Sequence, residues 1–177
     1  MYAAHFAAGL AIKGQFPRTP TWAIFTGVFL PDFGWVAMGL AGVEPSQGPA
    51  FFDDWSHSLT MIILSGILFA ALFWPKGVQV MCALWLAVFS HFLLDLPIHP
   101  KNIALFPHSF VHLGWGLWNV GQSPFWGATR YWWVELAVLL LLCLIYVQGA
   151  RKTRFAPNLV VASCVLVIGI HLMTLLP

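Results

Sequence analysis

The stretch that decides the fold is "VMCALWLAVFSHFLLDLPIHP" (Val80–Pro100), which is apolar enough to cross a bilayer yet carries a histidine and an aspartate. A membrane-spanning helix needs about 20 mostly apolar residues. Ionisable side chains inside such a helix are costly and usually face a bundle interior or a cavity. His91 and Asp95 are four residues apart, so both project from one face of a helix. The stretch therefore predicts a helical membrane protein with a polar site inside it.

The composition of the whole chain supports this prediction. The 177 residues are 60% hydrophobic and 8% charged, and the mean hydropathy is +0.82, whereas a soluble domain carries about 25% charged residues. A net charge of +2 is too small to indicate a nucleic acid partner. We expect a single integral membrane domain over residues 1–177, with membrane lipids as its surroundings and no separate soluble domain.

Hydropathy divides the chain into five or six apolar segments, and helix is expected because lipid cannot satisfy open backbone groups. The segments that are long enough to span, or nearly so, are 21–43, 58–74, 78–98, 131–148 and 158–176. The opening run 2–12 is either a short span in which Lys13 snorkels or a half-buried segment. The prediction is an all-α bundle of five or six transmembrane helices. Its motif-bearing part is 1–100, its outer loop is 99–130, and its C-terminal helical pair is 131–177.

Basic residues in the connecting segments orient the predicted helices. Alternate connections carry two, one and three Lys or Arg on one side of the membrane, against none and two on the other. Because cytoplasmic loops carry an excess of positive charge, both termini should face outward. Trp22 and Trp74 would then lie at the inner interface. The tryptophans expected at or near the outer interface are Trp55, Trp115, Trp118, Trp126, Trp132 and Trp133.

In this topology five ionisable residues from four helices fall in the outer half of the membrane. They are His5, Asp32, His57, His91 and Asp95. Imidazole and carboxylate ligands suit zinc, manganese or iron, and catalytic sites of this composition leave a position open for water. We predict that the five residues hold a divalent metal, zinc before manganese or iron, and that Asp32 or Asp95 acts as a general base. Taken singly, His5 and His57 read as interfacial histidines, and His91 with Asp95 as a hydrogen-bonded pair between helices.

Other polar residues carry weaker indications. Asp53 and Asp54 read either as a solvated loop or as acceptors that orient His57. Histidines of the outer loop either extend the metal site or are ordinary loop residues; these are His99, His108 and His112. Glu135 is expected at the outer interface, and His171 is an additional candidate in the last span. The three cysteines form no CxxC pair, so we expect buried thiols instead of a disulfide or a thiolate zinc site; they are Cys82, Cys143 and Cys164.

At the five candidate ligands the chain resembles the YdjM-like family of bacterial inner-membrane proteins, described as membrane-bound metal-dependent hydrolases. That family shows an early H-x3-G, then Pro-Asp, then Thr/Ser-His-Ser, and then Ser-His-x3-Asp. The matching positions here are His5 to Gly9, Pro31-Asp32, Ser56-His57-Ser58 and Ser90-His91 to Asp95. The order and spacing hold over roughly residues 1–100. The loop sequence "GWGLWN" (Gly114–Asn119) is similar to a branch of uncharacterised bacterial proteins near this family.

The resemblance implies a multi-pass protein of the bacterial inner membrane with a metal site facing the periplasmic side. The chain departs from the family at one place, because a His-Arg pair often precedes the Thr-His-Ser, and Phe52 and Asp53 occupy those positions here. A metal ligand or a phosphate-binding arginine of the family is therefore missing.

Two classes of function follow. The first is a metal-dependent hydrolase, and the outer location of the site favours a lipid or lipid-linked ester or phosphoester as substrate. The second is a non-catalytic accessory subunit of a larger membrane complex, in which the His/Asp set is structural or binds a cofactor and partner subunits cover the aromatic surface. A transporter is a third and weaker alternative, because the sequence has no inverted repeat.

Overall fold

The computed structural model describes residues 2–44, 53–99, 101–117, 130–153 and 155–174. Over these ranges the regular secondary structure is helical apart from one short hairpin, so the all-α prediction is confirmed. Phe52, Trp118 and Trp126, which the sequence analysis singled out, lie outside the described residues.

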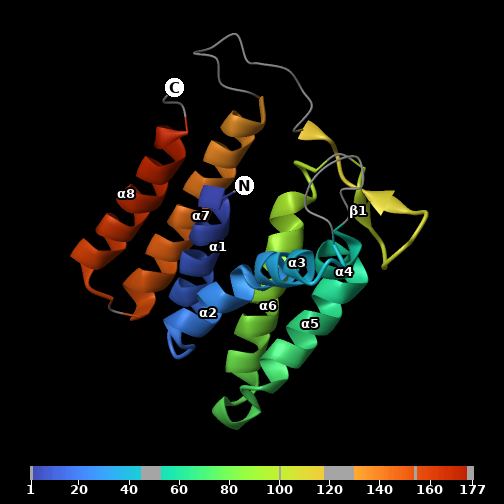
Figure 1. The fold of residues 1–177 in the computed structure, drawn as a ribbon. Helices are drawn as coiled ribbons and strands as arrows, with labels where there is room; N and C mark the ends of the chain where they lie inside the picture. Colours follow the sequence, from blue (N-terminus) through green and yellow to red (C-terminus); the bar gives the residue numbers. More distant parts are fainter. Residues whose placement is uncertain (1, 45–52, 100, 118–129, 154, 175–177) are drawn as a thin grey trace.

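The helices form a bundle with α1 between two antiparallel pairs (Figure 1). The elements in chain order are α1 (Tyr2–Gln15), α2 (Thr21–Val28), α3 (Leu30–Leu40), α4 (Asp54–His57), α5 (Leu59–Ala71), the 3-10 helix η1 (Trp74–Lys76), α6 (Val78–Asp95), β1 (Ile103–Ala104), β2 (His112–Leu113), α7 (Arg130–Thr153) and α8 (Pro157–Met173). One pair is α7 with α8 and the other is α5 with α6. Helix α1 contacts α7, α8, α2 and α6, so it joins the two pairs.

Among the described residues, α6 and the Trp132–Thr153 part of α7 are long and apolar enough to cross a membrane. The consecutive helices α2 and α3 pass the same test together, as one broken span. Helices α5 and α8 are apolar but shorter. Two helices, or three with the broken one, could thus cross a bilayer, and the larger number of five or six spans stays a prediction.

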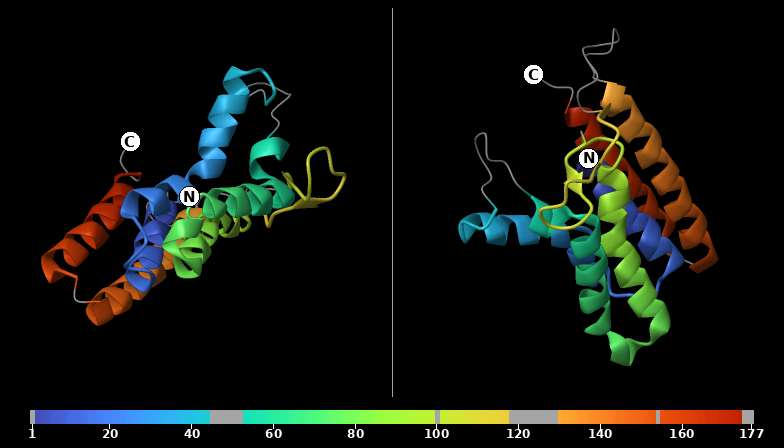
Figure 2. Two further views of the ribbon diagram at one scale, coloured as in Figure 1. Left: turned by 90° about the horizontal axis from the view of Figure 1, so that it is seen from below. Right: turned by 90° about the vertical axis from the view of Figure 1, so that its right-hand side faces the viewer.

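The predicted segment 21–43 is broken at Phe29, and α2 and α3 meet at an angle of 55°. Pro31 explains the break, because proline has no backbone N–H and its ring clashes with the carbonyl of the residue four positions earlier, here Gly27. Asp32 consequently lies in the first turn of α3, not in the middle of a continuous span. The break also turns α3 away from the bundle, from which it projects (Figure 2).

Small residues let α1 pack closely on its neighbours. A side chain at Gly149 of α7 would lie 2.5 Å from the backbone of Gly14, so the two helices touch through their main chains. A side chain at Gly9 would lie 2.7 Å from the ring of Phe25 on α2. Such close approach is typical of helix pairs in membranes. The buried alanines of α1 continue this face and are Ala3, Ala4, Ala7, Ala8 and Ala11.

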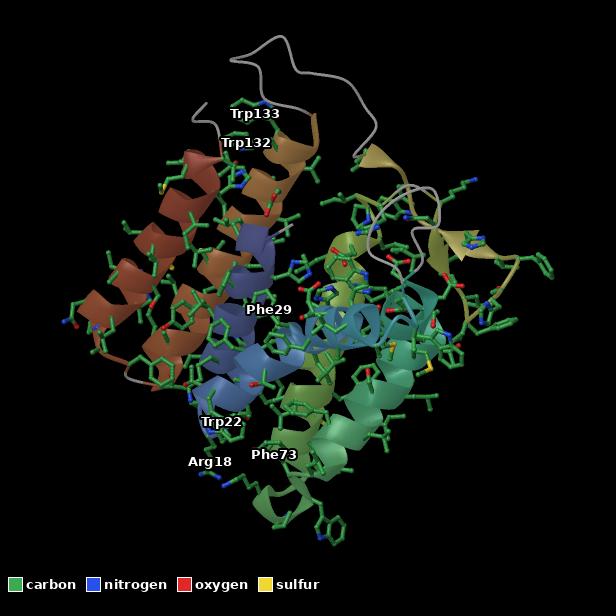
Figure 3. The ribbon with its side chains drawn as sticks, in the orientation of Figure 1. Arg18, Trp22, Phe29, Phe73, Trp132 and Trp133 are labelled. Carbon is green, nitrogen blue, oxygen red and sulfur yellow. The ribbon has the colours of Figure 1, made fainter. Side chains whose placement is uncertain are left out.

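The connections from α1 to α2, from α5 to α6 and from α7 to α8 lie at one end of the bundle (Figure 1). Arg18 and Trp22 lie toward this end, and Trp132 and Trp133 toward the other (Figure 3). The two groups thus lie toward opposite ends of the bundle, and their place at two membrane interfaces stays a prediction. Lys13 Nζ donates to the carbonyl oxygens of Pro17 and Thr19, each at 2.8 Å, and so stabilises the turn between α1 and α2.

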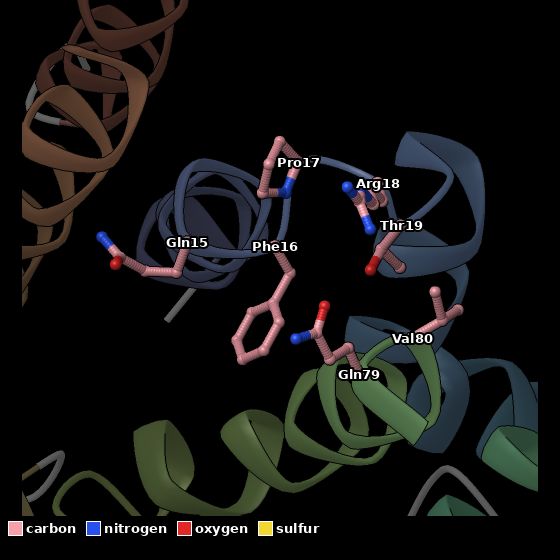
Figure 4. A pocket seen from close by; sticks show the side chains of 7 residues that line it. All are labelled: Gln15, Phe16, Pro17, Arg18, Thr19, Gln79 and Val80. Carbon is pink, nitrogen blue, oxygen red and sulfur yellow. The ribbon is translucent and has the colours of Figure 1, made fainter. Parts of the chain in front are cut away.

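A hollow opens beside this turn (Figure 4). Its lining residues are Gln15, Phe16, Pro17, Arg18, Thr19, Gln79 and Val80.

The hairpin formed by β1 and β2 covers the opposite ends of α5 and α6. Ile103 pairs with Leu113 and packs against Ile62 and Val88. The backbone N–H and the hydroxyl of Thr60 both donate to the carbonyl of Leu105, at 3.0 and 2.8 Å. The first part of the predicted outer loop is therefore fixed to the bundle.

The cysteines differ in their surroundings. All three are free, as predicted, but Cys82 is exposed on α6, where a buried thiol was expected. Cys143 is buried and packs near Cys164, between α7 and α8.

Candidate metal centre

The structure brings all five predicted residues into one cluster. Nε2 of His91 lies 3.1 Å from Oδ2 of Asp95 and 3.7 Å from Oδ1 of Asp32. Nε2 of His57 lies 3.6 Å from the same oxygen of Asp32, and Nε2 of His5 lies 3.6 Å from Oδ1 of Asp95. Two triads result, His5–His91–Asp95 and Asp32–His57–His91, and within each the ligand atoms lie within 4.8 Å of one another. Either triad could hold a metal ion.

Within each triad, the distances between ligand atoms fit an ion bound by nitrogen and oxygen. Ligand atoms bound tetrahedrally at about 2.0–2.1 Å from zinc are about 3.3–3.4 Å apart, and the distances above bracket this value. His91 belongs to both triads. Because one ring nitrogen has one lone pair, Nε2 of His91 can bind only one ion. The two triads therefore describe two alternative positions for one ion, and His91 would be a ligand in either.

Hydrogen bonds outside the cluster fix which histidine nitrogen faces it. Nδ1 of His91 lies 2.8 Å from the carbonyl oxygen of Val28, which can only accept, so Nδ1 carries the proton. The hydroxyl of Ser56 donates to the carbonyl of Asp53 and lies 2.7 Å from Nδ1 of His57, from which it accepts. These assignments follow from the hydrogen-bond network. When both rings are neutral, Nε2 of each therefore has a lone pair directed at the carboxylates, as metal binding requires.

Four separate elements supply the ligands, and each is held locally. His91 and Asp95 lie one turn apart on α6. His57 ends α4, whose first turn is capped by Glu44: Oε1 of Glu44 accepts from the backbone N–H groups of Trp55 and Ser56, at 2.5 and 3.0 Å. Asp32 is positioned by the break between α2 and α3, which places it in the first turn of α3.

His5, on α1, completes the set. Its ring centre lies 4.2 Å from that of His91 and 6.1 Å from that of Phe29, which sits at the junction of α2 and α3 (Figure 3).

Burial is uneven across the cluster. The side chains of His5, His91 and Asp95 are 5%, 2% and 9% exposed, whereas that of Asp32 is 38% exposed. The centre is thus closed between α1 and α6 and open beside α3. An ion held there would keep an accessible side next to Asp32, where water or a substrate can approach.

The residues around His57 modify its protonation. Burial lowers the pKa of His57, but the hydrogen bond of Asp32 and the negative charges of Asp53, Asp95 and Asp32 outweigh it and raise the pKa above its usual value. Burial raises the pKa of the Asp53 carboxyl. Asp53 and Asp54 were expected either in a solvated loop or as acceptors that orient His57; both are buried, at 6% exposure, and the contact of Asp53 with Ser56 is made by its backbone carbonyl.

The outer-loop histidines separate into two groups. Nε2 of His99 lies 3.9 Å from Oδ2 of Asp95, so this residue borders the centre. His108 and His112 belong to neither triad and line a surface hollow together with Asp53 and Asp54. Oδ2 of Asp54 accepts the backbone N–H of His108 at 2.9 Å, which fastens the loop to α4.

Glu135 and His171 form a second buried pair that the sequence analysis did not connect. Glu135 was expected at an interface but is 5% exposed, and its Oε1 accepts the backbone N–H groups of Ala3 and Ala4 at 3.1 and 3.3 Å. Its Oε2 lies 3.7 Å from Nδ1 of His171, whose ring stacks on Trp132 with 4.4 Å between centres. Glu135 thus caps the first turn of α1 from another helix. Neither Glu135 nor His171 belongs to the two triads found among the described residues.

Comparison with known proteins gives no relative: no family model, no curated protein and no solved structure matches the chain. The resemblance to the YdjM-like family therefore stays a prediction, and the site must be interpreted from its own geometry.

Proposed function

We propose that the chain is a membrane-bound, metal-dependent hydrolase whose divalent ion is held by His5, Asp32, His57, His91 and Asp95. The observation that carries the proposal is the arrangement around His91: its Nδ1 is committed to a backbone carbonyl while its Nε2 faces two carboxylates. Zinc is the ion proposed, and manganese or iron would suit the same ligands.

The chemistry proposed is hydrolysis of an ester or phosphoester. A bound divalent ion supplies an acidified water and polarises the substrate oxygen. Asp32, at the open edge of the cluster, is the better candidate for accepting a proton from an attacking water, because its side chain is 38% exposed. Asp95 is buried among histidines and is better suited to binding the ion and orienting His5 and His91.

The proposed location is the bacterial inner membrane, with the site toward the outer side and a lipid or lipid-linked molecule as substrate. Support comes from the apolar helices α6 and α7, from the basic connections at the opposite end of the bundle, and from the YdjM-like motifs.

A non-catalytic accessory subunit is the alternative, and one observation favours it. Asp53 occupies a position where the YdjM-like family often has arginine, so no cation for binding a phosphate is present there. In this account the same cluster ties together α1, α3, α4 and α6 as a structural centre or cofactor site, and partner membrane subunits cover the exposed apolar helices.

Metal analysis of the purified chain separates the two accounts. We expect about one zinc per chain, loss of at least tenfold in zinc affinity in His91→Ala, and no loss in His112→Ala, an exposed histidine outside the cluster. Hydrolysis of a fluorogenic phosphoester or ester should disappear with a chelator and return with zinc. Stoichiometric partner chains or a visible chromophore, without hydrolysis, would support the accessory subunit instead.

A further inference from the structure

The projecting helix α3 carries an exposed apolar stripe that begins at the metal candidate Asp32. Phe33, Val36 and Leu40 are 56%, 51% and 87% exposed. Asp32, Val36 and Leu40 are spaced four residues apart, and Phe33 lies on the same side, so the four share one face of the helix. From Asp32 to Leu40 the stripe is about 12 Å long, at 1.5 Å per residue.

The stripe is continuous with the open edge of the cluster. Asp32 is the most exposed of the candidate ligands, and the apolar residues follow directly from it along α3. The opposite side of α3 faces α4, because a side chain at Gly34 would lie 3.8 Å from Cβ of Ser56. Helix α3 projects from the bundle (Figure 2), and each of the three apolar side chains of the stripe is more than half exposed.

We propose that Phe33, Val36 and Leu40 seat the apolar chain of an amphiphilic substrate whose polar head binds at Asp32 and the metal centre. The proposal rests on the proposed function and specifies its substrate class. A lipid drawn into water to reach a buried site would expose its chain at about 25 cal/mol for each Å² of apolar surface. An apolar stripe leading to the ligands avoids this cost, because the chain stays in apolar surroundings while the head reaches the ion.

The site also has the charge that such a head requires. Two carboxylates balance a divalent ion, and the histidines are neutral when they bind metal. Counting only the ion and these two carboxylates, the centre would carry no net charge toward a phosphate or ester head. The proposed binding site for the chain, the seat formed by Phe33, Val36 and Leu40, is entirely apolar. It should therefore select for the presence and length of an apolar chain and not for polar groups on it.

Photolabelling with a non-hydrolysable probe tests the seat without relying on activity. The probe is dodecylphosphonate with a diazirine in its chain, used on zinc-loaded protein in nanodiscs of phosphatidylcholine and phosphatidylglycerol, with labelled residues identified by mass spectrometry. We expect at least threefold more labelling over 33–40 than at Leu68, an apolar residue of α5 that is 69% exposed. The excess should be lost on chelation and in Asp32→Asn.

Substitutions on the stripe supply the matched comparison. Leu40→Asn should remove most of the excess labelling, whereas Leu68→Asn should leave it unchanged, since both positions are exposed and neither substitution disturbs a core. Labelling of α3 that equals that of α5, or that is independent of zinc, would mean ordinary lipid contact and would overturn the seat. Zinc content measured on the same sample shows which idea failed. A zinc-loaded chain without the excess contradicts the seat alone, and a chain that binds no zinc contradicts the proposed function as well.

Discussion

Nε2 of His91 lies 3.1 Å from Oδ2 of Asp95 while Nδ1 of the same ring lies 2.8 Å from the carbonyl oxygen of Val28. A neutral ring has one N–H, and here Nδ1 carries it and donates to this carbonyl. The remaining lone pair faces a buried carboxylate, which is repulsive unless a cation lies between them. Either a second proton or a metal ion meets this requirement. The presence of His5, His57 and Asp32 around the same point favours a metal ion, because together they supply further ligands.

Ser56 should affect metal binding without touching the ion. Its hydroxyl accepts from Nδ1 of His57, so Ser56→Ala removes the partner that holds the ring and its tautomer. Loss of such an outer partner typically weakens metal affinity by about 10–100-fold. Zinc competition with a chromophoric chelator measures the change. Ser65→Ala is the control, because the Ser65 hydroxyl bonds only a carbonyl of its own helix, that of Ile62, among the described contacts; an equal loss in both variants would argue against the role of Ser56.

Pro31 should matter because it sets the position of Asp32. Pro31→Ala restores a backbone N–H and permits α2 to continue toward α3, which would move Asp32 away from His57 and His91. We expect zinc affinity to fall by about tenfold, the scale of losing one well-placed group, with the fold retained by circular dichroism. Pro157→Ala, at the start of α8, should leave zinc affinity unchanged. Unaltered affinity in Pro31→Ala would mean that the break does not position the ligand.

Gly149 should be intolerant of any side chain. A Cβ there would lie 2.5 Å from the backbone carbonyl of Gly14. A side chain could relieve such a clash by changing its rotamer, but the backbone of Gly14 cannot. Overpacking of this kind costs about 1–3 kcal/mol, so Gly149→Ala should lower the free energy of unfolding in a mild detergent. Gly169→Ala, where nothing lies within 4 Å, should be neutral or stabilising by about 1 kcal/mol or less through helix propensity. Equal stability of the two variants would contradict the packing of α1 on α7.

Glu135 should contribute to stability and not to metal binding. Glu135→Ala leaves two backbone N–H groups of α1 without their acceptor, at a cost of about 1–3 kcal/mol for each buried group. Glu135→Gln keeps an accepting oxygen and should recover much of the loss. Thermal unfolding compares the variants, and zinc content should be the same in both. A drop in zinc content would show that the Glu135–His171 pair and the metal centre are coupled.

The sequence alone identified the candidate ligands, because these residues are ionisable and lie in apolar segments. An aspartate beside a proline, and a His–Asp pair inside an apolar stretch, have few explanations in a membrane helix, which is why the five candidate ligands could be chosen before their contacts were known. The predicted helix around His91 also agrees with α6, because its apolar run is long and uninterrupted.

The contacts that the sequence did not indicate join residues far apart in the chain. Glu135 caps a helix more than 130 residues away, and Glu44 caps the short helix that holds His57. No local pattern signals either contact, since any buried backbone N–H group could have been capped by other acceptors. The 55° bend could be predicted only in part. Pro31 indicates a break, but the direction in which α3 leaves depends on its packing against α4.

X-ray absorption at the zinc edge of the purified, zinc-loaded chain tests the central claim most directly. We expect one zinc per chain with only nitrogen and oxygen ligands at about 2.0–2.2 Å, at least two imidazoles among them, and a changed spectrum in His91→Ala. A spectrum with sulfur ligands at about 2.3 Å, or one that His91→Ala leaves unchanged, would contradict a metal centre at His5, Asp32, His57, His91 and Asp95.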